Sequence, residues 1–184
     1  HGHERHGTSL YEEQIRVPLL LSVPGVRPQT VETPVSAIDL TATLLALAGA
    51  DTSRLDGHQL IGDALAEREP PLRPVFTDLH RYLSRKKKRT KDLKAVIEYP
   101  HKLILDRRRR TAQLFDLEAD PDELTNIIGE NKRTHYRLRL LLQKQLRKSR
   151  KMKGKVKGKG KRKRKRKGKR KGKRKAKQKA KKTP

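Results

Sequence analysis

Three histidines, His1, His3 and His6, lie within the first six residues of the chain. An imidazole is a cation or a neutral donor near neutral pH, and either form can contact a sulfate or phosphate oxygen. The histidines are therefore candidate ligands of an anionic substrate. The alternative is a solvated polar loop whose histidines bind nothing. A metal site is less favoured, because the spacing does not lie on one helix face and no carboxylate accompanies it at a recognisable ligand spacing.

Two groups of acidic residues could suggest acid–base chemistry. Glu12 and Glu13 are adjacent, so their side chains do not face each other on a helix or a strand. We interpret them as structural, with Arg16 pairing near the strand that follows. The acids of residues 120–123 are explained by a helix that starts with Asp120 as N-cap, then proline, then glutamate at the third position. Neither group is assigned to catalysis.

The first half of the chain predicts one strand and two helices. The apolar run Val17–Val23 is too short for a helix and predicts a buried strand, so the histidine loop would precede a core strand. The segment Val31–Ala50 predicts a helix with Ser36 as N-cap and a glycine stop at its end. Asp39 is interpreted as a first-turn acid that favours the helix dipole. A shorter helix is expected over Ile61–Arg68.

The second half predicts a small antiparallel sheet. A strand is expected at Val75–Asp78, followed by an exposed basic loop at Arg85–Lys91. Short apolar stretches over residues 94–117 then predict a meander whose hairpin tip carries Arg107–Arg110. The segment Thr134–Lys148 predicts a closing amphipathic helix. In the first half, His58 is interpreted as a solvated turn residue.

The charge of the chain is concentrated at its C-terminal end. Residues 147–184 hold 25 of the 49 lysines and arginines and no acid, so the remaining residues carry 24 basic side chains against 20 acidic ones. This tail is low in complexity and is expected to be disordered. Its densest run is expected to bind polyanions without sequence preference, because no aromatic residue is available for base stacking. The residues of that run are Lys161, Arg162, Lys163, Arg164, Lys165, Arg166 and Lys167.

Three ordered motifs of the chain resemble a known family. They are HG-x-x-LYEE-x-x-RVPLL from His6, VS-x-IDL-x-x-TLL-x-LAG from Val35, and LFDLEADPDELTN from Leu114. Together they are similar to the C-terminal part of the sulfatases, members of the alkaline phosphatase-like superfamily. The resemblance implies an α/β fold comprising the last strand and helix units of a doubly wound sheet, then a small antiparallel sheet and a helix. The expected domains are residues 1–80, residues 81–148, and the basic tail 149–184.

The resemblance also implies a function. In the family, a Lys or His before the Gly-Thr turn contacts the sulfate of the substrate, and that position is His6. A sulfate-ester hydrolase is therefore expected, with a divalent metal, usually calcium, and a formylglycine nucleophile. The Cys/Ser-x-Pro-x-Arg motif that supplies formylglycine and the family's Asp-Asp or Asp-His metal motifs do not occur in the sequence. We expect them upstream of a fragment that is inactive by itself.

Two other functions remain open. A phosphodiester or phosphonate hydrolase, or a phosphotransferase, of the same superfamily would share the C-terminal motifs. A non-catalytic module could instead bind nucleic acid or another anionic surface through its tail. No stretch reaches the roughly 18 apolar residues of a membrane span, and the absence of cysteine excludes disulfides and thiolate metal sites. Of the possible locations, the cell envelope or periplasm is favoured.

Overall fold

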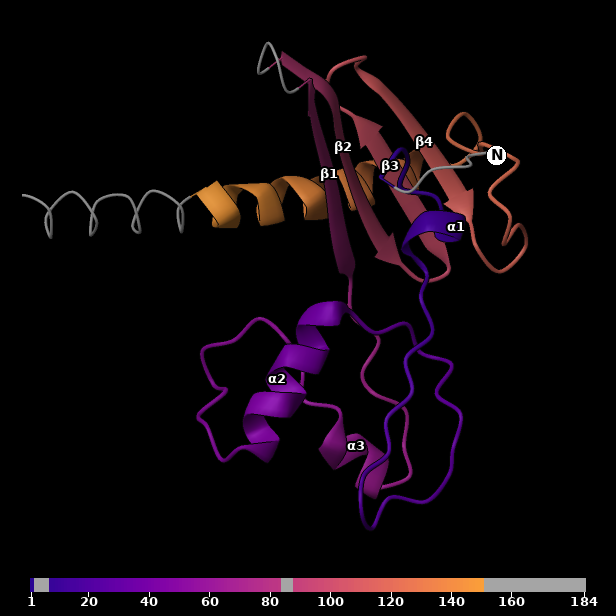
Figure 1. Ribbon diagram of the computed structural model, residues 1–184. Coiled ribbons are helices and arrows are strands. Elements are labelled where there is room, and N and C mark those ends of the chain that lie inside the picture. Colours follow the sequence, from indigo (N-terminus) through magenta and orange to yellow (C-terminus); the bar gives the residue numbers. More distant parts are fainter. Residues whose placement is uncertain (2–6, 84–87, 151–184) are drawn as a thin grey trace, which may run out of the picture. The chain divides into compact units, whose positions relative to one another are not determined.

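The computed structural model describes residue 1, residues 7–83 and residues 88–150 (Figure 1). The chain divides into two units, His1–Leu142 and Gln143–Pro184. In the first unit, a four-stranded sheet is preceded by three helices. The described residues of the second unit, 143–150, are helical.

The sheet is an antiparallel meander in the order β1-β2-β3-β4. Its strands are β1 (Val75–Leu83), β2 (Lys88–Glu98), β3 (His101–Asp106) and β4 (Thr111–Asp116). Short turns join the last three strands, and the second turn is the predicted arginine hairpin. The meander is confirmed. The prediction of an exposed loop at Arg85–Lys91 is in part wrong, because β2 already begins at Lys88.

One face of the sheet carries the main core. Ala95, Ile104 and Phe115 are buried there together with Leu10, and the half-buried Tyr11 packs against them. Tyr11 immediately precedes α1 (Glu12–Ile15), a single turn of helix that lies over this face (Figure 1). The segment after the histidines is therefore fixed to the sheet by burial of apolar side chains.

The opposite face is covered by helical residues 132–142, as Figure 1 shows. Leu138 and Leu142 are buried, and Arg137 forms an ion pair with Glu98 at the end of β2. The predicted closing helix is confirmed, since residues 134–148 are all helical.

The helix predicted after Ser36 is also confirmed as α2 (Ala37–Leu47). The Asp39 side chain accepts the backbone N–H of Ser36 in a capping box, and Gly49 ends the helix with a φ of 75°. A left-handed φ of this kind favours glycine. The shorter helix is α3 (Ile61–Leu65), which ends before the expected Arg68.

Two element predictions are wrong. Residues 17–23 form no strand, and Val17 and Leu20 are 75% and 91% exposed. No helix starts at Asp120, where the carboxylate accepts the backbone N–H groups of Leu124 and Thr125 in a non-helical turn.

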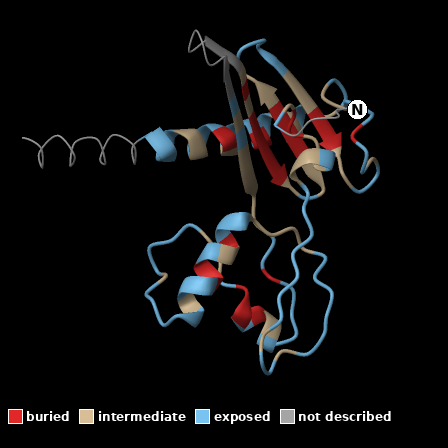
Figure 2. Cartoon of the chain, viewed as in Figure 1, coloured by how far each residue is buried: buried red, intermediate tan, exposed pale blue. Residues whose placement is uncertain are grey.

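Apolar exposure is concentrated in the segment before the sheet. Figure 2 shows buried residues gathered in the sheet and mainly exposed ones along residues 17–73. Ile38, Leu44 and Leu47 on α2 are each at least half exposed. The apolar side of this helix is thus left uncovered by the described residues.

Candidate substrate-binding site

The predicted site residues are only partly described. His3, His6 and the polyanion-binding run Lys161–Lys167 lie outside the described residues. His1 is described, as is the turn Gly7–Ser9 that follows His6. The geometry of the predicted site is therefore defined at His1 and at this turn.

The imidazole of His1 is engaged by other parts of the chain. Its ring stacks on Tyr11 with ring centroids 3.6 Å apart and an interplanar angle of 8°. Its Nε2 lies 3.1 Å from the carbonyl oxygen of Glu123, an acceptor, so this nitrogen is the donor of the pair. One nitrogen of His1 is thus used in holding the structure together.

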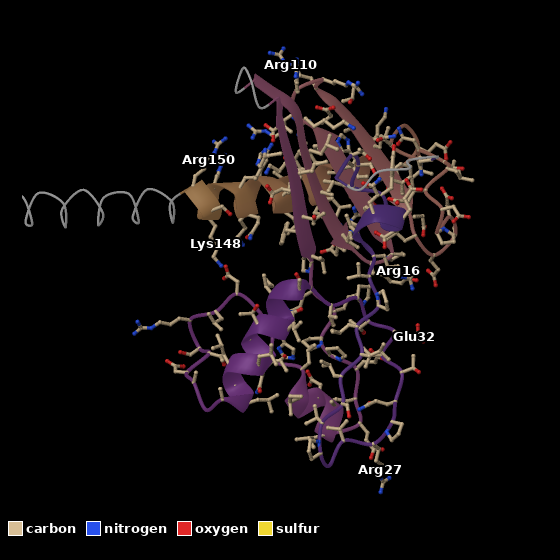
Figure 3. The ribbon with its side chains drawn as sticks, viewed as in Figure 1. Arg16, Arg27, Glu32, Arg110, Lys148 and Arg150 are labelled. Carbon is tan, nitrogen blue, oxygen red and sulfur yellow. The ribbon has the colours of Figure 1, made fainter. Side chains whose placement is uncertain are left out.

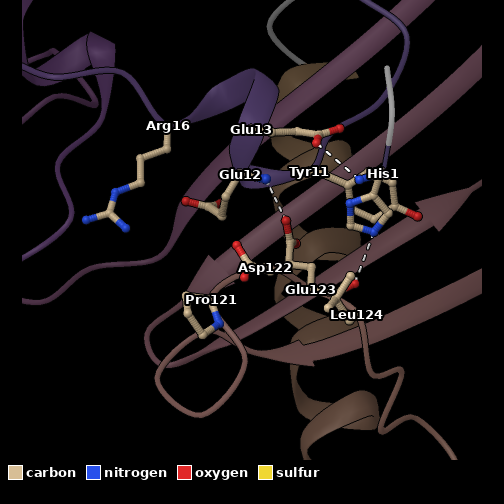
Figure 4. A pocket seen from close by; sticks show the side chains of 9 residues that line it. All are labelled: His1, Tyr11, Glu12, Glu13, Arg16, Pro121, Asp122, Glu123 and Leu124. Atoms are coloured by element: carbon tan, nitrogen blue, oxygen red, sulfur yellow. Dashed lines mark hydrogen bonds and ion pairs between the residues drawn. The ribbon is translucent and has the colours of Figure 1, made fainter. Parts of the chain in front are cut away.

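His1 lies at the edge of a pocket of about 420 Å³ (Figure 4). The other residues that line it are Tyr11, Glu12, Glu13, Arg16, Pro121, Asp122, Glu123 and Leu124. Four of these nine residues are acids, against one arginine and one histidine. An anion is repelled by such a surplus of carboxylates, so this pocket does not suit a sulfate group.

A buried ion-pair network lies at this pocket. The ammonium of Lys102 on β3 is 2.7 Å from Glu12 Oε1 and 2.8 Å from Glu123 Oε1, and the lysine is fully buried. The second oxygen of Glu123 accepts the backbone N–H of Glu12 at 2.5 Å. Burial raises the pKa of Glu123, while its hydrogen bond to Lys102 opposes that rise. The network joins the segment around α1 to the sheet and to the turn after β4.

This role of Lys102 was not predicted from the sequence. Strand alternation could have revealed it, because Lys102 is two residues from Ile104 and therefore shares its face of the sheet. The earlier structural interpretation of Glu12 agrees with its place in the network.

The turn after His6 is held by side chains on both sides. Gly7 has a φ of 69°, which permits the tight turn. The backbone N–H groups of Thr8 and Ser9 donate to Gln14 Oε1 at 3.1 and 3.2 Å, and Gln14 Nε2 donates to the Thr8 hydroxyl at 2.9 Å. The ammonium of Lys91 on β2 donates to the Thr8 carbonyl. Thr8 and Ser9, two and three residues after His6 in the sequence, are therefore anchored.

A second polar cluster lies around α2 and α3. The Asp39 side chain accepts the N–H of His58 at 2.7 Å and pairs with Arg73 at 2.5 Å. Asp39 therefore does more than the predicted first-turn acid, since it links its helix to two loops.

His58 is not the solvated turn residue that the sequence suggested. Its Nε2 lies 2.5 Å from Asp63 Oδ2, and Arg68 reaches the other oxygen of Asp63 at 2.7 Å. The hydrogen bond from His58 is the main cause that holds the pKa of Asp63 below its usual value. The carboxylates of Asp39 and Asp63 are thus both occupied by contacts that connect α2, α3 and the neighbouring loops.

The described residues do not fit a metal site. Among them, no group of three or more His, Asp or Glu side chains is placed to hold a metal ion. In the same part of the chain, no helix has the length and apolar composition needed to cross a membrane.

The chain matches the family described as N-sulphoglucosamine sulphohydrolase, C-terminal, over residues 6–152. Choline-sulfatase from Rhizobium meliloti (strain 1021) is 35% identical over 133 residues, which are 68% of this chain and 23% of the relative. Arylsulfatase K from Mus musculus is 33% identical over 142 residues, which are 71% of this chain and 25% of the relative. The chain belongs to the sulfatase family, as the three motifs indicated. It spans about a quarter of the length of the curated relatives it matches.

Solved structures show the same fold. A 2-O GAG sulfatase superposes with a TM-score of 0.65 at 23% identity, covering 78% of this chain and 32% of the other. A phosphonate monoester hydrolase from Silicibacter pomeroyi has a TM-score of 0.52 at 21% identity, over 68% of this chain and 27% of the other. The predicted α/β class with its C-terminal antiparallel sheet is thereby confirmed. The expected domain boundaries stay a prediction.

Proposed function

We propose that this chain is the C-terminal part of a sulfate-ester hydrolase, in which His6 contacts the sulfate group. The observation that carries the proposal is the match to the sulfatase family, which begins at His6. The anchored turn supports it, because Gln14 and Lys91 hold Thr8 and Ser9, two and three residues after His6 in the sequence. A substrate-binding group must be held close to its working geometry to be effective.

The exposed apolar surface fits this proposal. Residues 17–23 and α2 expose large apolar side chains, and the curated relatives are about four times as long as the matched region. Exposed apolar side chains that gather into a patch mark an interaction site. We infer that it packs against the remainder of a sulfatase domain.

Sulfatases use a divalent metal and a formylglycine nucleophile. The described residues offer no group that would hold the metal, and the sequence has no Cys/Ser-x-Pro-x-Arg motif. The role proposed for this chain is therefore limited to binding and positioning the ester. Calcium as the metal, with its ligands and the formylglycine in another part of the protein, belongs to the proposal, as does a location in the cell envelope or periplasm.

Hydrolysis by the full-length protein that carries residues 1–184 tests the proposal. An aryl sulfate and an aryl phosphodiester are compared as substrates. Replacement of His6 by Ala should lower kcat/KM for the sulfate about 100-fold, since it removes a group aimed at the transferred anion. His6→Lys should retain most of the activity, because lysine can supply the same positive charge. Lys132→Ala, an exposed change on the C-terminal helix, is the control.

Each alternative function has its own outcome. A clear preference for the phosphodiester would favour a phosphodiester or phosphonate hydrolase of the same superfamily. The phosphonate monoester hydrolase from Silicibacter pomeroyi has a similar fold. Absence of hydrolysis, together with salt-sensitive polyanion binding that disappears when residues 149–184 are removed, would favour the binding module. Retained activity in His6→Ala would remove His6 from the site.

A further inference from the structure

A second hollow lies beside the anchored turn. It has a volume of about 220 Å³ and is bordered by the turn, by β2, and by the hairpin between β3 and β4. Its lining residues are Thr8, Ser9, Leu10, Tyr11, Lys91, Leu93, Ile104, Asp106, Arg109, Thr111, Ala112 and Gln113. We call it the hairpin groove. Thr8 and Ser9, which line the groove, are the residues two and three positions after His6 in the sequence.

The hairpin groove differs in charge from the acidic pocket. Lys91 and Arg109 line it against the single acid Asp106. That acid is occupied in shaping the hairpin, since its Oδ1 accepts the backbone N–H groups of Arg108 and Arg109 at 2.9 and 3.0 Å. The side chain of Arg109 is 79% exposed and lies 3.9 Å from the other oxygen of Asp106, too far for a hydrogen bond. Its guanidinium can therefore reach another anion.

The rest of the hairpin adds to this positive charge. Arg107, Arg108 and Arg110 are exposed beside Arg109, and Figure 3 labels Arg110 at the hairpin tip. Arg107 also pairs with Asp92, whose Oδ2 lies 3.7 Å from the arginine Nη1. Arginine is suited to bidentate recognition of planar or tetrahedral oxyanions. In the sequence, this cluster indicated only the tip of a predicted hairpin.

We propose that the hairpin groove binds a second anionic group of the substrate, a sulfate or carboxylate on a sugar next to the one whose ester is cleaved. The substrate is then a polyanionic saccharide. This inference rests on the proposed function, because it takes His6 as the contact of the first anion. An ester with one anionic group would leave the hairpin groove without a ligand. Thr111 and Gln113 place polar side chains in the same groove, where saccharide hydroxyls can be hydrogen-bonded.

Hydrogen exchange of the whole 184-residue chain with a fully sulfated tetrasaccharide tests the inference. Peptides that cover residues 7–11 and 105–113 should exchange at least about fivefold more slowly in the saturated complex, because bound backbone opens less often. Peptide-resolved exchange separates the groove from binding by the basic tail. Circular dichroism confirms that each variant is folded.

Three substitutions sharpen the test. Arg109→Gln should raise about fivefold the tetrasaccharide concentration that gives half-maximal protection of the groove peptides. This is the change in Kd expected for loss of one exposed ion pair. Arg109→Lys should keep part of the affinity, because the charge remains while the bidentate guanidinium is lost. Arg139→Gln removes an equal charge from an exposed position on the helix and should leave groove protection unchanged.

The inference is overturned if the groove peptides are not protected, if Arg109→Gln and Arg139→Gln behave alike, or if a single-stranded oligonucleotide of equal charge protects the groove equally well. The last result would show a general polyanion surface. Protection without sulfate-ester hydrolysis would support the groove and contradict the proposed function. Sulfate-ester hydrolysis without protection of the groove peptides would support the proposed function and contradict the role of the hairpin groove.

Discussion

Replacement of Lys102 by methionine tests whether the buried ion-pair network holds the segment around α1 on the sheet. Lys102 is fully buried and lies within 2.8 Å of both Glu12 and Glu123. Methionine keeps much of the side-chain volume but removes the charge that both carboxylates share. Loss of one member of a buried pair costs about 3–5 kcal/mol. Since domains are stable by only about 5–15 kcal/mol, we expect a large fall in the free energy of unfolding.

The size of this loss depends on pH through Glu123. Burial already raises the pKa of that carboxyl, so the folded chain holds its proton more tightly than the unfolded chain does. Stability linked to this proton is present below the ordinary glutamate pKa and is lost as the pH rises through the raised value. Removal of Lys102 should raise the pKa further. The defect of Lys102→Met should therefore be smaller at about pH 4 than at about pH 7.

Urea denaturation of the 184-residue chain, followed by far-ultraviolet circular dichroism, measures both effects. Lys132→Met removes one charge from an exposed position and should change the free energy of unfolding by less than about 0.5 kcal/mol. The double variant Lys102→Met/Glu123→Gln should recover part of the loss, because the buried carboxylate is removed as well. Equal unfolding free energies for Lys102→Met and Lys132→Met would refute the reasoning.

Two further predictions concern the segment before the sheet. Gly57→Ala should lower stability by about 1–3 kcal/mol, because a Cβ there would lie 2.2 Å from the carbonyl oxygen of Ile38. Gly129→Ala meets nothing within 4 Å and serves as the control in the same thermal melts; equal melting temperatures would contradict the clash. Asp63→Asn should destabilise the chain at neutral pH, because the charge that pairs with His58 is lost. The lowered pKa of Asp63 means that this contribution is present above the ordinary aspartate pKa and disappears as the pH falls through the lowered value. A pH-independent difference between Asp63→Asn and the parent chain would exclude this explanation.

Local signals in the sequence were sufficient where the structure depends on neighbouring residues. Ser36 and Asp39 are three residues apart, as a capping box requires, and α2 starts where they indicate. The arginine run between two apolar stretches marked the hairpin between β3 and β4. In both cases the partners are close in the chain.

Partners far apart in the chain could not be identified in this way. Asp120-Pro121-Asp122-Glu123 has the composition of a helix start, but the Glu123 side chain is bound to Lys102 and to the backbone of Glu12 instead. Burial of that ion pair outweighs the local preference for a helix. Nothing near Glu12 indicates that its partner lies 90 residues away.

The apolar run at residues 17–23 shows a different limit. Its composition predicts burial, yet Leu20 is 91% exposed. Composition indicates that a segment favours an apolar environment, while the packing partner has to be present for that environment to exist. Among the candidate site residues, His1 was the one that the structure could place, and its contacts to Tyr11 and Glu123 are long-range ones that the sequence did not indicate.

The 90-residue separation between Glu12 and Lys102 also has a consequence for biosynthesis. A ribosome makes the turn that follows His6 long before it makes β3, and Glu123 emerges later still. The hairpins of the sheet need only short loops to close, whereas the α1 segment must wait for its distant partners. The nascent α1 segment therefore stays undocked until translation has passed Glu123, which is the interval in which a chaperone would have most to do.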